Sequence, residues 1–203
     1  MRKKIKEIKR IKLKNKKILK KYPWLTPVNV WTGKLDKDYD YSYTLADEIP
    51  RGWLKAFGWQ MIDEINEVLK KTRASITVEQ IKEKYGRLEF YCAAPEEVQR
   101  IISDYGCISE NICINCGTPD VPMTGKGYVL PMCEKCYCKE TEYRHFTHED
   151  FMEFIKDDNF KIPNSYTVRH YNTKDGYKDE VRDISDKVSK IRNRYNKRIK
   201  KHL

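Results

Sequence analysis

The sequence predicts an α+β protein with a helix-rich body, a short β-hairpin, an embedded four-cysteine zinc module and basic helices at both termini. Three observations support this fold class. Apolar residues recur every three or four positions in several segments, one segment alternates apolar and polar residues after a turn, and four of the seven cysteines form two C-x2-C pairs. With 39% hydrophobic and 12% aromatic residues, the 203-residue chain can bury a modest core.

Charge divides the chain into regions. Residues 1–21 contain twelve Lys or Arg and one Glu, and the residues from Lys187 onward contain eight Lys or Arg and no acid. Residues 22–186 carry 21 basic and 29 acidic groups, a net charge of −8. Because clustered cations attract phosphate and an acidic body repels it, nucleic acid is expected at the two ends.

The chain shows no signal peptide and no apolar run near the eighteen or so residues that a spanning helix requires. We therefore expect a protein of the cytoplasm, in a bacterial host cell if the resemblance described below holds. Paired cysteines in a reducing compartment favour a metal site over disulfides.

The basic N-terminal segment, residues 1–21, is expected to form a helix or arm. Ile5, Ile8, Ile11, Ile18 and Leu19 follow helical spacing among the lysines. Like charges three or four residues apart also allow a frayed, solvated terminus. A nucleic-acid-binding arm is the functional alternative, and a membrane-surface helix is less favoured because no aromatic anchor is present.

Residues 22–110 are expected to form an α+β body. Its first part is an aromatic loop that should pack over the body, because Pro23, Pro27 and Gly33 exclude a long helix. Stacking of these rings on bases is less favoured, since aspartates between them would repel phosphate. A core helix follows, with an apolar stripe made of Trp53, Phe57, Met61, Ile65 and Val68 or Leu69.

The rest of the body is predicted to hold a β-hairpin, or a helix-turn-strand, and a further helix. The turn falls at Tyr85-Gly86, and the strand pattern after it places Cys92 as a buried small residue. The second helix starts at Pro95, and Gly106 is expected to stop it.

Residues 141–203 are expected to form a helical C-terminal region with a basic end. Thr147 and Asp150 resemble a helix N-cap, and a short strand and turn follow. A terminal amphipathic helix is predicted from apolar residues spaced by three or four positions: Val181, Ile184, Val188, Ile191, Tyr195 and Ile199.

The strongest motif lies in residues 111–140, the predicted zinc module. Cys113, Cys116, Cys133 and Cys136 form C-x2-C-x16-C-x2-C, a spacing typical of a tetrathiolate Zn²⁺ site. The order of knuckle, hairpin and helix resembles a treble-clef zinc finger, with a zinc ribbon as the alternative. Four thiolates leave no coordination position for water, so a structural zinc ion is favoured over a catalytic one.

Other ligands and an enzymatic site remain alternatives. Cys107 or Cys138 could replace a predicted ligand, whereas His145 and His148 are expected at the surface or in caps. A metal-dependent nuclease of the HNH type needs a histidine base in an Asp-His-x-x-P context, which the four histidines lack. The usual phosphate-loop, dinucleotide, hydrolase and zinc-protease motifs are also missing from the sequence, so we expect no enzyme.

Several short sequence segments together resemble those of a family of small zinc-finger-containing proteins carried by bacteriophages and prophages. They are KYPWLTPVNVWTG, DYDYSYT, DEIPRGWLKAFGW, IKEKYGRLEFY and CINCG followed by GYVLPMCEKC, and they cover about residues 21–138. The resemblance implies an accessory role in phage biology and no particular reaction. The zinc cysteines are the only functional residues that it carries over.

The leading functional hypothesis is a zinc-stabilised accessory protein that acts by binding nucleic acid, or a nucleic-acid-bound host protein, through its basic ends. The alternative is an anti-defence protein whose acidic body and DKDYDYSYT segment inhibit a host nuclease, such as a CRISPR effector. The predicted nucleic-acid contacts are Lys3, Lys4, Lys6, Lys9, Arg10, Lys12, Lys14, Lys16, Lys17, Arg192, Arg194, Lys197, Arg198, Lys200 and Lys201.

Overall fold

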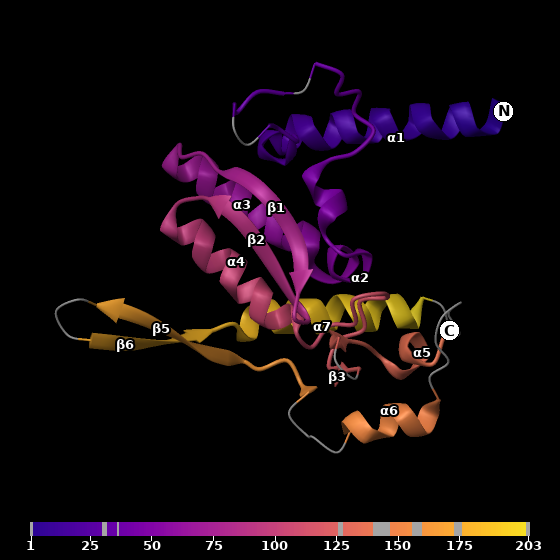
Figure 1. Ribbon diagram of the computed structural model, residues 1–203, viewed down its shortest axis with the longest axis vertical. Helices are drawn as coiled ribbons and strands as arrows, with labels where there is room; N and C mark the ends of the chain where they lie inside the picture. The colour runs from indigo at the N-terminus through magenta and orange to yellow at the C-terminus, as the bar shows by residue number, and fades with distance from the viewer. Residues whose placement is uncertain are drawn as a thin grey trace.

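A computed structural model describes residues 2–29, 32–35, 37–125, 128–139, 147–155, 160–172 and 176–201, without the side chains of residues 2–5, 169–172 and 176–177. Helices and small antiparallel hairpins make up this part of the chain, which confirms the α+β class (Figure 1). Its strands form three separate two-stranded sheets within the described residues. None of the described helices combines the length and apolar character needed to cross a membrane.

The helices and strands follow one another along the chain in this order: α1 (Arg2–Lys21), η1 (Pro23–Leu25), η2 (Leu45–Glu48), α2 (Arg51–Trp53), η3 (Leu54–Gly58), α3 (Trp59–Thr72), β1 (Thr77–Lys84), β2 (Arg87–Ala93), α4 (Glu96–Ser109), β3 (Met123–Thr124), β4 (Leu130–Pro131), α5 (Glu134–Tyr137), α6 (His148–Ile155), β5 (Ser165–Asn172), β6 (Gly176–Asp183) and α7 (Ser185–Lys200).

The central helical segment runs through α2, η3 and α3 and supplies much of the core. Its predicted apolar stripe is confirmed, with Trp53, Phe57, Met61 and Ile65 all buried. Leu69, rather than Val68, continues the buried stripe. The sequence did not predict that η3 is a π-helical turn, in which i→i+5 bonding widens the helix.

The β1–β2 hairpin and α4 cover this segment. Tyr85 and Gly86 both adopt positive φ, 52° and 81°, as a two-residue hairpin turn requires. The predicted hairpin is thus confirmed. Cys92, expected to be buried, is only half-buried, because it lies near the open end of β2.

Gly106 does not stop α4, which continues to Ser109. A Cβ atom at Gly106 would lie 2.9 Å from Nε of Arg87. The guanidinium of Arg87 in turn donates to the carbonyl of Ser103 and to Glu110, at 3.1 and 2.5 Å. The glycine therefore makes room for an arginine that crosses the helix, which is a packing role that a terminator signal does not reveal.

The N-terminal segment forms one continuous helix whose later part docks on the body. Asn15 and Leu19 are buried, and Nδ2 of Asn15 donates to the carbonyl of Tyr41 at 2.9 Å. The Nζ atom of Lys16 lies 4.7 Å from the centre of the Tyr41 ring. The aromatic loop is therefore ordered and packed as predicted for Tyr39 and Tyr41, whereas Trp31 lies outside the described residues.

The C-terminal region differs most from the prediction. Residues 176–183 form strand β6, paired with β5, and α7 begins only at Ser185. Val181, expected on the apolar stripe of the helix, is 72% exposed. Ile184, Val188 and Ile191 belong to the main core, so α7 is part of the body rather than of a separate helical region.

A buried polar network ties these C-terminal elements to the body. Arg182 of β6 donates to both carboxylate oxygens of Asp104, at 2.9 and 3.1 Å, and the hydroxyl of Tyr166 donates to the same group at 2.8 Å. Lys187 of α7 pairs with Glu64, which also accepts from Tyr105 at 2.7 Å. Asp104 is 4% exposed, and its ion pair therefore has little competition from water.

We expect Asp104→Ala to lower the free energy of unfolding by about 3 kcal/mol, because it removes the buried carboxylate that pairs with the guanidinium of Arg182. Glu96→Ala is the matched control, since its exposed pair with Arg100 contributes about 0.5 kcal/mol or less. Urea denaturation of both variants measures the difference. Equal losses would contradict a structural role for this network.

Candidate metal centre and basic surfaces

The first cysteine pair lies in a tight knuckle after α4. The N–H of Cys113 donates to the carbonyl of Thr118 at 2.8 Å, and the N–H of Gly117 donates to the carbonyl of Cys113 at 2.8 Å. Gly117 adopts a φ of 78°, a conformation that favours glycine. The knuckle therefore closes on itself and directs Cys113 and Cys116 to one side.

The back of the knuckle lies directly against α2. Gly52 donates its N–H to the carbonyl of Ile114 at 2.8 Å, and Nε1 of Trp53 donates to the carbonyl of Ile112 at 2.8 Å. A Cβ atom at Gly52 would lie 2.3 Å from the carbonyl oxygen of Cys113. This role of Gly52 was not predicted, although the glycine stands next to Trp53, the first residue of the predicted apolar stripe.

The β3–β4 hairpin brings the second cysteine pair to the knuckle. The N–H of Ile114 donates to the carbonyl of Pro131 at 2.9 Å, which joins the knuckle to β4. Cys133 then precedes the single helical turn α5, and the N–H of Cys136 donates back to its carbonyl at 2.9 Å. The knuckle, hairpin and helix follow in the predicted order.

The structure brings together the four cysteines that the sequence predicted as ligands. The Sγ atoms of Cys113, Cys116, Cys133 and Cys136 all lie within 4.8 Å of one another. The Sγ atoms of Cys116 and Cys133 are 3.6 Å apart, and tetrahedral coordination with metal–sulfur bonds of about 2.3 Å needs about 3.8 Å. The donor set therefore fits one metal ion.

The thiols of the tetrad shift one another's pKa. Hydrogen bonds from Cys113 and Cys133 lower the pKa of Cys116, so one thiolate is stabilised by its neighbours. Hydrogen bonds to Cys113 and Cys116 raise the pKa of Cys133, and burial raises the pKa of Cys136 to about 12. Four thiolates at this separation need a positive charge between them, which a metal ion supplies.

The alternative ligands lie away from the cluster. Cys107 is buried in α4, where burial raises the pKa of its thiol to about 11. The Sγ atom of Cys138 donates to the carbonyl of Thr147 at 3.3 Å. His148 contacts Glu134, whereas His145 lies outside the described residues. In the described part of the chain, the cysteine tetrad is the one cluster with metal-ligand chemistry.

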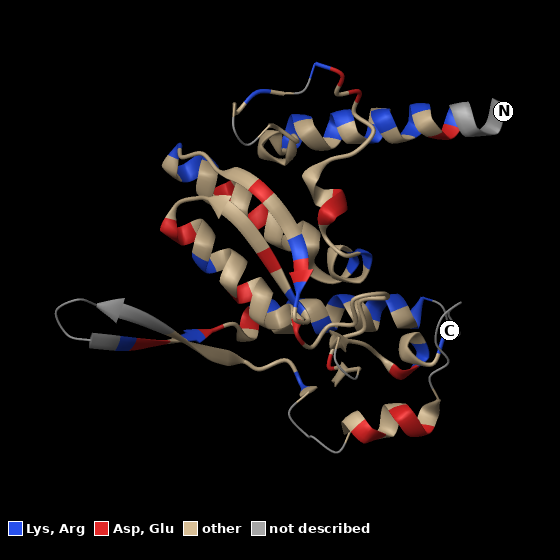
Figure 2. Cartoon of the chain, viewed as in Figure 1, with Lys and Arg blue, Asp and Glu red and all other residues tan. Residues whose placement is uncertain are grey.

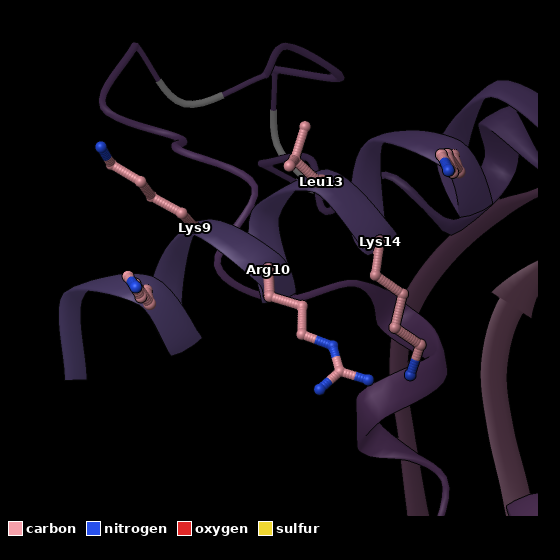
Figure 3. Close-up of a pocket in the computed structure, with 6 residues that line it drawn as sticks. Lys9, Arg10, Leu13 and Lys14 are labelled. Atoms are coloured by element: carbon pink, nitrogen blue, oxygen red, sulfur yellow. The ribbon is translucent and has the colours of Figure 1, made fainter. Parts of the chain in front are cut away.

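The second functional feature is the surface of α1, which extends beyond the body and carries cations along its length (Figure 2). Five cations and one exposed apolar residue line a shallow groove of about 510 Å³: Lys6, Lys9, Arg10, Leu13, Lys14 and Lys17. Figure 3 shows the side chains of Lys9, Arg10, Leu13 and Lys14 extending from this part of the helix. Their spacing of three or four residues places them along one side of the helix.

Other predicted contact residues are engaged within the chain. Lys12 pairs with Asp40 at 2.6 Å, and this pair lowers the pKa of the Asp40 carboxyl to about 2. Arg192 donates to both carboxylate oxygens of Asp120, at 3.0 and 2.7 Å. Both cations therefore serve contacts between an end and the body.

The remaining predicted contacts fall into two groups. Lys3 and Lys4 lie in α1, where the structure describes their backbone but not their side chains. The predicted contact residues near the end of α7 are exposed or half-buried: Arg194, Lys197, Arg198, Lys200 and Lys201.

Comparisons add no relative: no protein-family model, characterised protein or solved structure matches this chain.

We expect Cys133→Ser to purify without stoichiometric metal and to melt at a lower temperature than the intact protein, because the tetrad loses one ligand. Cys138→Ser is the matched control, since its thiol is outside the cluster. Elemental analysis and thermal melting measure both effects. Full metal occupancy in the Cys133 variant would contradict the assignment of this ligand.

Gly52→Ala is expected to lower the free energy of unfolding by about 2 kcal/mol, because the added methyl group meets the backbone of the knuckle. The control is Gly58→Ala, whose methyl group meets the flexible end of Leu54 at 2.8 Å. Both changes give the helix the same gain in propensity, so their difference reports the clash. A Gly52 variant as stable as the control would contradict the close contact.

Proposed function

We propose that this protein is a zinc-stabilised, non-enzymatic nucleic-acid-binding protein whose helix α1 contacts phosphates. The observation that carries the proposal is the row of exposed cations from Lys6 to Lys17. Glu7 is the only acidic residue in the first 21. A surface of this kind attracts a phosphate backbone through release of its counterions.

The dimensions of the row fit this partner. The eleven steps from Lys6 to Lys17 span about 16 Å of α-helix at a rise of 1.5 Å per residue. Along a duplex, phosphates on one strand advance about 3.4 Å per step, so the row faces about five steps. Since phosphate contacts carry no sequence information, we expect α1 to give affinity rather than sequence specificity.

Zinc is the metal that we assign to the tetrad. Four thiolates in a tetrahedral arrangement suit Zn²⁺, which is redox-inactive and binds thiolate sulfur at about 2.3 Å. A closed set of four protein ligands leaves no coordination position for water or substrate. The zinc ion would therefore stabilise the packing of residues 112–137 against α2 and would perform no reaction.

The phage setting is a further part of the proposal and rests on the resemblance of residues 21–138. It implies a protein that acts in the cytoplasm of a bacterial host, on nucleic acid or on a host protein bound to it. A metal-dependent nuclease of the HNH type has less support, because none of the four histidines stands in an Asp-His-x-x-P context.

The anti-defence alternative depends on an acidic surface that imitates nucleic acid. Several carboxylates of the body are instead paired with cations from the two ends. Asp63 pairs with Lys21 at 2.9 Å and Asp120 with Arg192 at 2.7 Å, while Glu64 contacts Lys187. These pairs reduce the negative field of the body, so mimicry of a phosphate backbone has less support than binding of one.

We expect a triple variant with Lys9→Gln, Arg10→Gln and Lys14→Gln to bind duplex DNA more weakly, with a shallower salt dependence. The slope of log K against log salt should fall in magnitude by about 0.9 for each phosphate contact removed. Filter binding over a range of salt concentrations measures this slope.

The matched control carries Lys34→Gln, Lys70→Gln and Lys71→Gln, which remove the same charge from exposed positions outside α1. An equal weakening in both triple variants would assign the effect to net charge alone. Binding that does not change with salt in the intact protein would contradict phosphate contact by α1.

A further inference from the structure

A second surface combines the metal centre with the C-terminal helix. A groove of about 950 Å³ lies beside the tetrad, and three segments that are distant in sequence line it. Figure 1 shows the C-terminal part of α7 beside α5. The residues that supply its charge and its apolar surface are Lys55, Lys135, Lys139, Tyr195, Arg198 and Ile199.

The groove has an excess of positive charge. Lys55, Lys135 and Lys139 are exposed and have no carboxylate partner among the described residues. The one acidic residue in the lining, Glu134, contacts His148. A zinc ion with four thiolates adds a net charge of −2, so the four cations still exceed the negative charge of the lining.

Part of the groove lining is aromatic and apolar and comes from α7. The guanidinium carbon of Arg198 lies 5.7 Å from the centre of the Tyr195 ring. Ile199 next to it is 41% exposed. A tyrosine ring and a guanidinium plane are surfaces on which unpaired bases stack. A duplex keeps its bases inside and presents mainly phosphates to such a surface.

The lining residues are held by packed elements. Lys55 lies in the π-helical turn η3, which follows Gly52 at the knuckle and itself contacts α7. α7 itself is fixed by the buried Val188 and Ile191. Packing of these elements against the body limits the positions that the ring and the cations can take before a ligand binds, which lowers the entropy cost of binding.

We propose that this groove binds single-stranded nucleic acid, with an unstacked base on Tyr195 and Arg198 and the flanking phosphates on Lys55, Lys135 and Lys139. The inference rests on the proposed nucleic-acid-binding function and adds a preference for unpaired strands. α1 contacts phosphates of either form, whereas the groove distinguishes a single strand from a duplex by its bases.

The test uses the full-length, zinc-loaded protein with three fluorescent probes of equal length: single-stranded oligothymidylate, the same strand without bases, and a duplex. Tyr195→Ala should weaken binding of oligothymidylate about tenfold and leave the other two probes unchanged. The matched control is Tyr91→Ala, which removes a ring that also has a cation over it, in this case Lys82, and that lies outside the groove. Thermal melting and metal content confirm that both variants fold.

Two results with the Tyr195→Ala variant would overturn the proposal. One is equal binding of oligothymidylate by the Tyr195 and Tyr91 variants. The other is an equal loss on all three probes in the Tyr195 variant. The double variant Lys55→Gln and Lys139→Gln gives a third outcome that would also overturn the proposal. If this variant has a lower zinc affinity and unchanged binding of oligothymidylate, the groove only offsets the charge of the thiolates.

The α1 variants separate this inference from the proposed function. If the α1 triple variant binds every probe as well as the intact protein does, while Tyr195→Ala is selective for oligothymidylate, the α1 proposal fails and the groove is supported. If the α1 variant is weakened on all probes and the Tyr195 variant on none, the groove proposal fails alone. Absence of all binding by the intact protein overturns both.

Discussion

The close contact between α2 and the cysteine knuckle is the constraint on which the rest of the structure depends. Gly52 brings the helix within hydrogen-bond distance of Ile114, and Trp53 reaches the carbonyl of Ile112 from the core. The metal centre is therefore joined to the body through backbone contacts rather than through a flexible linker. This contact also places the tetrad beside η3 and the end of α7, which together form the basic groove.

The basic residues have two roles that the net charge of the chain does not distinguish. Cations from both ends hold the chain together, since Lys12, Lys21, Lys187 and Arg192 pair with carboxylates of the body. Burial makes the inner pairs important for the arrangement of elements, whereas exposed pairs contribute little. The cations that remain at the surface of α1 lie on the other side of the helix from the docked residues Asn15 and Leu19, and they are therefore available to a partner.

The sequence predicted features that follow from local spacing, and it missed features that follow from contacts between distant segments. The stripe from Trp53 to Leu69, the Tyr85-Gly86 turn and the cysteine tetrad are local patterns, and the structure confirms them. The prediction that Gly106 ends α4 was wrong, because the missing side chain of this glycine makes room for Arg87 from β2. β6 was missed because its residues pair with β5, and that pairing outweighs a helical spacing that continues from α7.

Division of the basic residues between a projecting helix and a packed groove has a physical consequence for recognition. Exposed lysines on α1 keep their side-chain freedom and act over the range of screened electrostatics, about 8 Å at physiological ionic strength, so they favour encounter with any phosphate backbone. A groove fixed by the knuckle and by α7 offers a ring and cations at set positions, and such a surface selects the geometry of its ligand. Under the two proposals, affinity and selectivity would therefore arise from different elements of the chain.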